Sequence, residues 1–195
     1  MRIFIRVVPP VLACCCLLAA SSPLTLAQAP AAAKPAVGTP IPPAKVYGKL
    51  LSQLESEFVG AAEAMPEDKY NFAPPSTAGE FKGVRTFADQ VKHVADANYY
   101  FFGDPGVSDA DAKAKSDAIK NLKTKAEIVQ ALKDSFTQAH AYVDAITPDN
   151  AFVMTANGTR GGMAAFGIAH FMDHYGQMVE YLRMCGITPP ASAPR

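Results

Sequence analysis

The sequence predicts an all-α protein whose core is a four-helix bundle. Four segments carry apolar residues at spacings of three and four, the period of one face of a helix. The chain has no convincing alternation of apolar and polar residues, which is the pattern of a half-buried strand. Proline or glycine follows each of the four segments, where a helix has to end. Four such helices bury their apolar faces most simply against one another.

The first predicted helix runs from about residue 44 to residue 65. Pro66 ends it, because proline disfavours the helical conformation at the residue before it. Its apolar face consists of Tyr47, Leu50, Leu51, Leu54, Phe58, Ala61 and Met65.

The second predicted helix begins at Thr86 and ends near Gly103. The Thr86 side chain can cap the free N–H groups, and Asp89 suits the helix dipole in the first turn. One stripe consists of Phe87, Val91, Val94, Asn98 and Phe101, and the adjoining stripe of Gln90, His93, Ala97 and Tyr100. We therefore expect His93 at the border of the apolar face.

The third and fourth predicted helices also have clear start and stop signals. Thr124 and Glu127 form a capping-box pattern before the third, and Pro148 stops it. Its apolar positions are Ile128, Leu132, Phe136, Ala139, Val143 and Ile146. The fourth runs from about residue 159 to residue 185. One face of it carries Met163, Phe166, Gly167, His170, His174, Gln177, Met178 and Tyr181.

The first two connections between these helices, residues 66–85 and 104–123, exceed the usual bundle loop. The second could contain a short helix of its own. Both are long enough to let the chain cross over the bundle or cover one of its ends.

Residues 1–29 have the three parts of an export signal. Arg2 and Arg6 supply positive charge, residues 11–20 are apolar, and an Ala-x-Ala pattern ends at Ala29. The apolar stretch is too short for a bilayer core of about 30 Å. We expect a cleaved signal and a periplasmic or extracellular protein without stable membrane insertion. An uncleaved leader that anchors the chain is the alternative.

Downstream of the signal we expect a linker, one domain and a tail. Residues 30–43 are rich in alanine and proline, residues 44–190 hold the helices, and residues 191–195 are expected to be disordered. Loss of the leader would leave Cys185 as the one cysteine, so no internal disulfide is expected. It would also leave 16 basic and 18 acidic residues, a balance that gives nucleic acid no basic patch to bind.

Three of the four histidines form a candidate metal site. His170 and His174 are four residues apart, so on a helix their Cβ atoms lie about 5–6 Å from each other. Their apolar neighbours place both toward the interior, where neutral imidazoles need partners that one metal ion could supply. His93 comes from a helix expected beside the fourth, at an axial distance of about 8–10 Å. Three ligands leave a coordination position open, as in catalytic sites.

Other histidine patterns are weaker. His140 is interpreted as a partly buried residue at the edge of the bundle. Asp96 and Asp173 follow His93 and His170 by three residues and could fix the ring tautomers, although solvent-facing helix charge is the commoner role. Tyr100, Tyr175 and Gln177 could reach a substrate. No Glu-x-x-His, Cys-x-x-Cys-His or H-E-x-x-H pattern occurs, which argues against a carboxylate di-iron centre, c-type haem or a zincin.

Two separated motifs resemble one known family. Residues 86–98 read TFADQVKHVADAN, and residues 170–183 read HFMDHYGQMVEYLR. They resemble the second and last helices of the DinB/YfiT-like family of metal-dependent bundle proteins, and residues 186–190 (GITPP) also fit. The resemblance extends from about residue 44 to residue 190.

The resemblance implies an up-down-down-up four-helix bundle, often dimeric. It also implies one divalent ion, reported in the family as zinc, nickel, iron or manganese, held here by His93, His170 and His174. Characterised members include thiol-dependent transferases and an isomerase that uses a small thiol, whose pKa a metal would lower. An export signal departs from those members, because small reducing thiols are chiefly cytosolic.

Three functions are therefore left open by the sequence. The first is a metal-dependent enzyme acting on a small molecule, by thiol transfer or by hydrolysis. The second is a non-enzymatic protein that binds a metal or a small molecule. The third is a structural or interaction bundle whose histidines hold no ion.

Overall fold

The computed structural model describes residues 34–103 and 108–194. The chain divides into two units, Met1–Thr39 and Pro40–Arg195, and the helices and strands of the described residues lie in the second. The predicted signal at residues 1–29 lies outside the described residues, so its cleavage and the export of the protein stay predictions. Among the described residues, no helix is long and apolar enough to cross a membrane.

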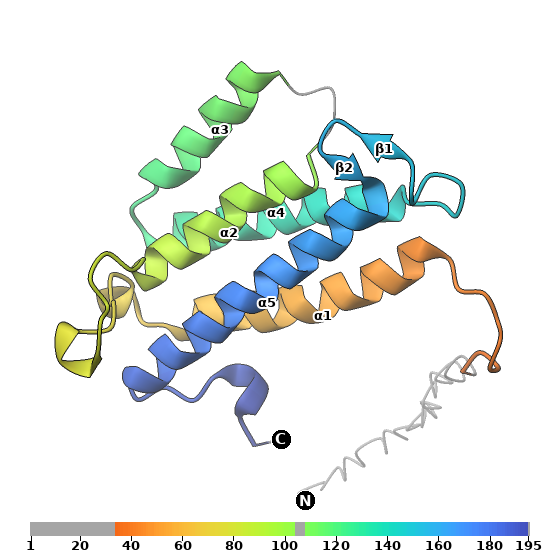
Figure 1. The fold of residues 1–195 in the computed structure, drawn as a ribbon. Helices are drawn as coiled ribbons and strands as arrows, with labels where there is room; N and C mark the ends of the chain where they lie inside the picture. Colours follow the sequence, from red (N-terminus) through yellow and green to blue (C-terminus); the bar gives the residue numbers. More distant parts are fainter. Residues whose placement is uncertain (1–33, 104–107, 195) are drawn as a thin grey trace, which may run out of the picture. The chain divides into compact units, whose positions relative to one another are not determined.

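Four long helices make up the core of the second unit (Figure 1). They are α1 (Pro43–Ala64), α2 (Phe87–Phe101), α4 (Lys125–Asp144) and α5 (Arg160–Met184). α2 packs against α4 and α5, and α1 packs against the same two helices. The all-α prediction is confirmed, and all four helices lie where the sequence predicted them. A 3₁₀ turn at Pro190–Ser192 returns the chain to α1.

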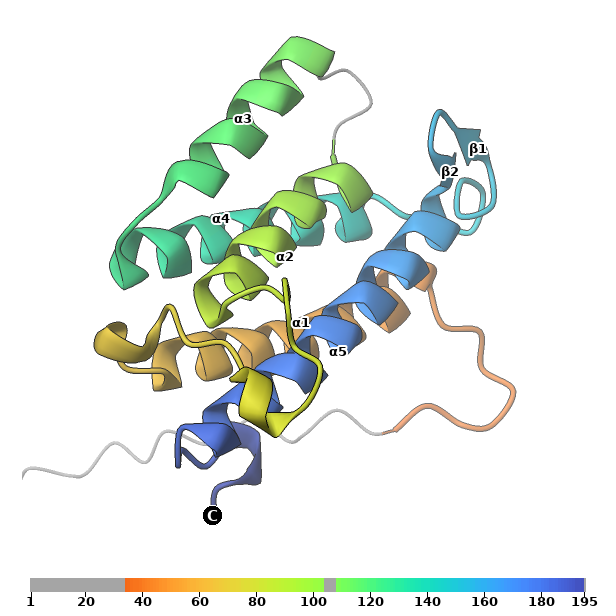
Figure 2. The same ribbon diagram turned by 60° about the vertical axis from the view of Figure 1, so that its left-hand side comes forward.

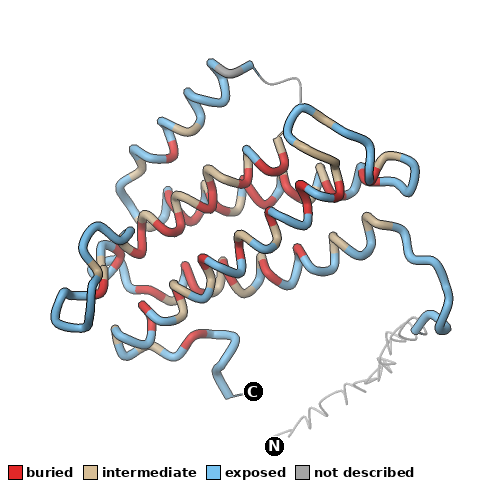
Figure 3. The backbone as a smooth tube through the Cα atoms, in the orientation of Figure 1, coloured by how far each residue is buried: buried red, intermediate tan, exposed pale blue. Residues whose placement is uncertain are grey.

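The core lies between the inward faces of these helices, where burial is concentrated (Figure 3). Phenylalanine supplies its largest side chains, and burial of each contributes about 1.5–3 kcal/mol. The fully buried phenylalanines are Phe58, Phe87, Phe102, Phe136 and Phe171. The predicted stripe of α2 is buried along its whole length, including the polar Asn98.

The start of α2 is fixed by its cap and by the preceding connection. The Thr86 hydroxyl accepts a hydrogen bond from the N–H of Asp89 at 3.1 Å, as the sequence predicted. The N–H of Phe87 donates to the carbonyl of Phe72 at 2.8 Å, and that of Ala88 to the carbonyl of Tyr70 at 2.7 Å. These bonds set the position of α2 and therefore of His93.

The start of α4 is joined to the end of α1. Thr124 and Glu127 form the predicted capping box. Lys125 Nζ donates to the carbonyl oxygens of Glu63 at 2.7 Å and Met65 at 2.8 Å. A lysine at this point satisfies carbonyl groups that the last turn of a helix leaves without partners.

The second long connection contains a helix of 13 residues, α3 (Asp109–Asn121). It packs on α2 and lies outside the group of four core helices (Figure 2). Among the residues of α3 whose burial is described, Ile119 is the one in the buried core. Asp96 of α2 accepts a hydrogen bond from Ser116 at 3.0 Å and pairs with Lys120 at 3.6 Å. Asp96 therefore bonds to α3, and among the described residues it makes no hydrogen bond to a histidine.

A short hairpin precedes α5. Strands β1 (Met154–Thr155) and β2 (Gly158–Thr159) pair antiparallel, with Met154 opposite Thr159. Two-residue strands are too short to show an alternating pattern, so the sequence did not predict them. Thr159 ends the hairpin and caps α5 by accepting from the N–H of Gly162 at 3.1 Å.

Candidate metal centre

α2 and α5 approach closely at Gly167, one turn before His170. A Cβ atom at this position would lie 2.5 Å from a ring carbon of Phe102. Only glycine lets the ring occupy that space. The contact brings the C-terminal end of α2 against α5 and so sets the distance between the histidines that the two helices carry.

The three predicted histidines converge. The Nε2 atom of His170 lies 3.2 Å from Nε2 of His93 and 3.1 Å from Nε2 of His174. One ring nitrogen from each residue lies within 4.8 Å of the other two. Nitrogen ligands about 2.0–2.1 Å from a tetrahedral zinc are about 3.3–3.4 Å apart. The three imidazoles are thus positioned to hold one metal ion.

Burial keeps these imidazoles in the neutral form that binds metals. His174 is 5 % exposed, and His93 and His170 are half-buried. Burial, followed by the charge of His93, lowers the pKa of His170 to about 4. Burial, followed by the charges of His170 and His93, lowers the pKa of His174 to about 4. Burial and then Arg85 lower the pKa of His93.

The far sides of the rings differ in their contacts. Nδ1 of His174 lies 2.6 Å from Oε1 of Gln90, which is 1 % exposed. Nδ1 of His170 is buried and has no hydrogen-bond partner among the described residues. Three imidazole nitrogens suit zinc, nickel or iron, and they leave room in the coordination sphere for another group. The donor set therefore fits a divalent ion of the kind that the family resemblance implies.

A sequence profile of the DinB superfamily matches residues 50–178. This chain belongs to the DinB superfamily. The match contains all three histidines and runs from α1 into α5. No curated protein matches the sequence of this DinB chain.

Aromatic side chains flank the histidines of this DinB protein. The ring centroid of Phe101 lies 5.1 Å from the ring centroid of His170 and 5.2 Å from that of Phe166. Tyr100 also packs against Phe101, at 5.3 Å. Phe166 and Tyr100 are 63 % and 61 % exposed. The sequence placed Phe166 on the inward face of α5, and its exposure corrects that prediction. An exposed apolar surface thus adjoins the candidate metal centre.

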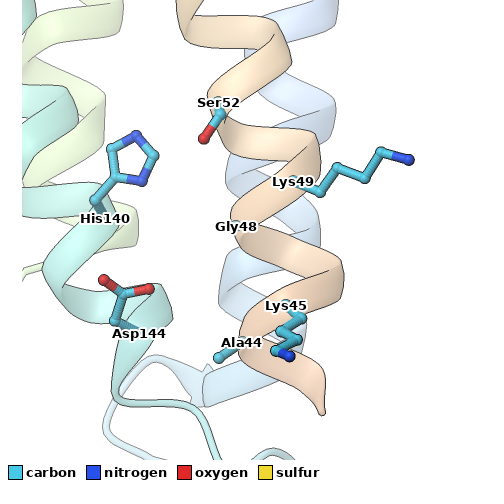
Figure 4. A pocket seen from close by; sticks show the side chains of 7 residues that line it. All are labelled: Ala44, Lys45, Gly48, Lys49, Ser52, His140 and Asp144. Atoms are coloured by element: carbon cyan, nitrogen blue, oxygen red, sulfur yellow. The ribbon is translucent and has the colours of Figure 1, made fainter. Parts of the chain in front are cut away.

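Two other predicted residues lie in different surroundings. Asp173 accepts a hydrogen bond from Gln177 Nε2 at 3.3 Å, and no hydrogen bond joins it to His170 among the described residues. His140 is partly buried, as predicted, and its Nε2 lies 2.7 Å from the carboxylate of Glu55. It lines an open groove between α1 and α4 together with Lys45, Ser52 and Asp144 (Figure 4). None of the three clustered histidines lines this groove.

The sequence pattern indicated no role for Gln90, the hydrogen-bond partner of His174. Gln90 was visible on the same stripe of α2 as His93, three residues earlier. A polar side chain that close to an inward stripe needs a hydrogen-bond partner once it is buried. The pattern did not indicate which residue of α5 would supply that partner, because this depends on the register between the two helices.

Proposed function

We propose that this DinB protein is a metal-dependent enzyme that binds one divalent ion through His93, His170 and His174. The observation that carries the proposal is the approach of three buried or half-buried Nε2 atoms, with separations of 3.1 and 3.2 Å from His170. A bound ion of this kind supplies Lewis acidity and lowers the pKa of a coordinated thiol or water. Zinc, nickel, iron and manganese are the candidate ions.

The chain's own residues would hold and shield the reacting group. The buried imidazoles stay neutral near pH 7, so no proton has to leave before an ion binds. The exposed rings of Phe166 and Tyr100 offer a surface for an apolar part of a small-molecule substrate. The reaction classes that fit are thiol transfer and hydrolysis.

The remaining family properties are part of the same proposal. An up-down-down-up order of helix directions requires α2 and α4 to run in the same direction. The connection that contains α3 is long enough to return the chain for that purpose. Export is proposed from residues 1–29, and the homodimer from the family resemblance.

Metal content tests the metal site. Protein purified without added metal and without a histidine tag is measured by elemental analysis, before and after incubation with zinc and removal of the excess. We expect close to one equivalent in the wild type and almost none in His174→Ala. His140→Ala is the matched control and should retain the ion. Less than a tenth of an equivalent in the wild type after loading would favour a structural bundle.

Activity on panels of thioether-forming and hydrolysable substrates tests catalysis separately. Turnover should disappear with the metal in His174→Ala. Phe166→Ala should keep its metal and raise KM for substrates with an apolar group, because the exposed ring binds that group. Turnover that persists in metal-free protein would contradict the proposed mechanism.

A further inference from the structure

A row of three hydrogen bonds runs from the candidate metal centre to the surface of α5. Nδ1 of His174 lies 2.6 Å from Oε1 of Gln90. Nε2 of Gln90 donates to Oε1 of Gln177 at 2.7 Å. Nε2 of Gln177 donates to a carboxylate oxygen of Asp173 at 3.3 Å. The inner end of the row is buried, and the outer end reaches solvent.

Asp173 gives this row a direction. Its main-chain carbonyl oxygen lies 3.5 Å from Nε2 of Gln177 and can only accept a hydrogen bond, so Gln177 turns its NH₂ group toward Asp173. The Oε1 atom of Gln177 then faces Gln90, and the NH₂ group of Gln90 donates a hydrogen bond to it. The oxygen of Gln90 is thereby left facing His174, and it requires a donor there. A proton on Nδ1, the ring nitrogen that faces this oxygen, would supply that donor.

We propose that Gln90, oriented by Gln177, is a positioning residue that holds His174 in the Nδ1–H tautomer and so presents the Nε2 lone pair to the metal ion. In a neutral imidazole one ring nitrogen carries a proton and the other has a free lone pair. A proton fixed on Nδ1 therefore leaves the lone pair of Nε2 available to a metal ion. The tautomer itself does not depend on the proposed function, whereas its effect on metal binding does.

Burial keeps water from replacing the hydrogen bond between Gln90 and His174. Gln90 is 1 % exposed and His174 is 5 % exposed, so bulk water has little access to the bond between them. His170 offers a contrast within the same cluster, because its buried Nδ1 has no hydrogen-bond partner among the described residues. Of these two ligands, His174 is therefore the one whose ring orientation a hydrogen bond to its Nδ1 atom holds.

The tautomer can be observed without any metal. Long-range ¹H–¹⁵N correlation spectra of the metal-free full chain distinguish protonated from unprotonated ring nitrogens. We expect the Nδ1–H form for His174 in the wild type and in Gln90→Glu, which keeps an acceptor oxygen toward the ring. Gln90→Met keeps the side-chain length but removes the acceptor, so the Nε2–H form should appear. A wild-type His174 that is mainly Nε2–H would overturn the proposal.

Metal affinity tests the consequence of the tautomer. Loss of a group that orients a metal-binding histidine weakens metal affinity by about 10–100-fold. We expect that loss for zinc in Gln90→Met, close to wild-type affinity in Gln90→Glu, and no change in Gln53→Met, an exposed glutamine of α1. Far-ultraviolet circular dichroism checks that each variant is folded. A folded Gln90→Met with wild-type affinity would overturn the positioning role.

The two proposals fail in different ways. A wild-type chain that takes up no zinc but shows His174 in the Nδ1–H form would reject the proposed function and leave the tautomer assignment standing. A chain that binds zinc, but in which His174 exchanges between tautomers in the metal-free state, would reject the tautomer assignment and leave the proposed metal binding standing. Gln177→Met should give a smaller shift toward Nε2–H than Gln90→Met, and an unchanged spectrum would remove Gln177 from the proposal.

Discussion

At the scale of single residues, the Nε2 atom of His170 lies close to those of His93 and His174, and within the described part of the chain no carboxylate forms an ion pair with these three rings. Burial is the main cause of the low pKa values of His170 and His174; the charge of His93 adds to it at His170, and the charges of His170 and His93 add to it at His174. Protonating any one ring places a positive charge beside two others. The metal-free protein therefore keeps this cluster uncharged at neutral pH.

The first prediction concerns the stability of the metal-free protein toward acid. The pKa of His170 and His174 is 6.5 when unperturbed and about 4 in the folded chain. Between these values the unfolded chain binds protons that the folded chain does not, so the free energy of unfolding falls as the pH falls. Above pH 6.5 both states are neutral and the histidines have no such effect. Urea unfolding of chelator-treated protein between pH 7.5 and pH 5 should show this decline. The decline is expected between about pH 6.5 and pH 4, the pKa values of the unfolded and the folded chain.

Two variants separate this decline from the titration of other groups. His170→Gln removes one of the low-pKa rings and should flatten the pH dependence. Gln53→Met changes an exposed glutamine of α1 that carries no titratable group, and it should leave the slope near that of the wild type. Equal slopes in all three proteins would show that the clustered histidines do not cause it.

The residues of the candidate site were partly predictable. His170 and His174 followed from their four-residue spacing on an apolar face, and His93 from the border of another. The use of Gln90 and the exposure of Phe166 did not follow. Both depend on how α5 is rotated and shifted against α2, and a helical period gives the face of one helix without its register against a neighbour.

At the scale of secondary structure elements, the contact at Gly167 determines how near α2 and α5 come. The ring of Phe102 occupies the space that a side chain would need. The same helix contains Gly176, where an added Cβ would meet nothing within 4 Å. Of these two glycines of α5, packing requires Gly167 and does not require Gly176.

The second prediction compares alanine at these two positions. Gly167→Ala forces Phe102 or the helix to move, and overpacking of this kind costs about 1–3 kcal/mol of stability. It should also weaken zinc binding, because the histidines of α2 and α5 would separate. Gly176→Ala should raise stability by about 0.5–1 kcal/mol, because alanine favours a helix interior over glycine. Urea unfolding and zinc titration measure both effects, and equal behaviour of the two variants would contradict this account.

The elements themselves were predictable where local signals are strong. Thr86, Thr124 and Thr159 each precede a helix and cap it in the structure. The hairpin was missed because two paired residues on each side leave no periodic pattern. α3 was anticipated only as a short helix of unstated bounds, because its polar sequence places one residue in the core.

At the scale of the whole molecule, the histidines join segments from distant parts of the sequence. His93 and His170 are 77 residues apart, and α3, α4 and the hairpin lie between them. Ligand binding that occurs only in the folded state stabilises that state by mass action. An ion shared by α2 and α5 would therefore act on the stability of the domain as a whole.

The third prediction is a loss of thermal stability when metal is removed. A ligand present at a thousand times its Kd stabilises by about 4 kcal/mol. For a domain of this size each kcal/mol corresponds to about 2–4 °C, so chelation should lower Tm by about 10 °C. Differential scanning calorimetry with and without chelator measures this shift. His174→Ala should have the same Tm with and without chelator. If chelator lowers the Tm of His174→Ala as much as that of the wild type, the stabilising ion is bound at another site.

The distance along the chain between His93 and His170 has one more consequence. Among the described residues Cys185 is the one cysteine, so this part of the chain cannot form an internal disulfide. Constraining a long stretch of unfolded polypeptide removes more of its freedom than constraining a short one. A coordinated zinc ion would serve as a cross-link that oxidants and reductants do not break, because zinc has no redox chemistry. This cross-link would be lost at acidic pH, where the imidazoles bind protons in place of the ion, or when the concentration of free metal is low.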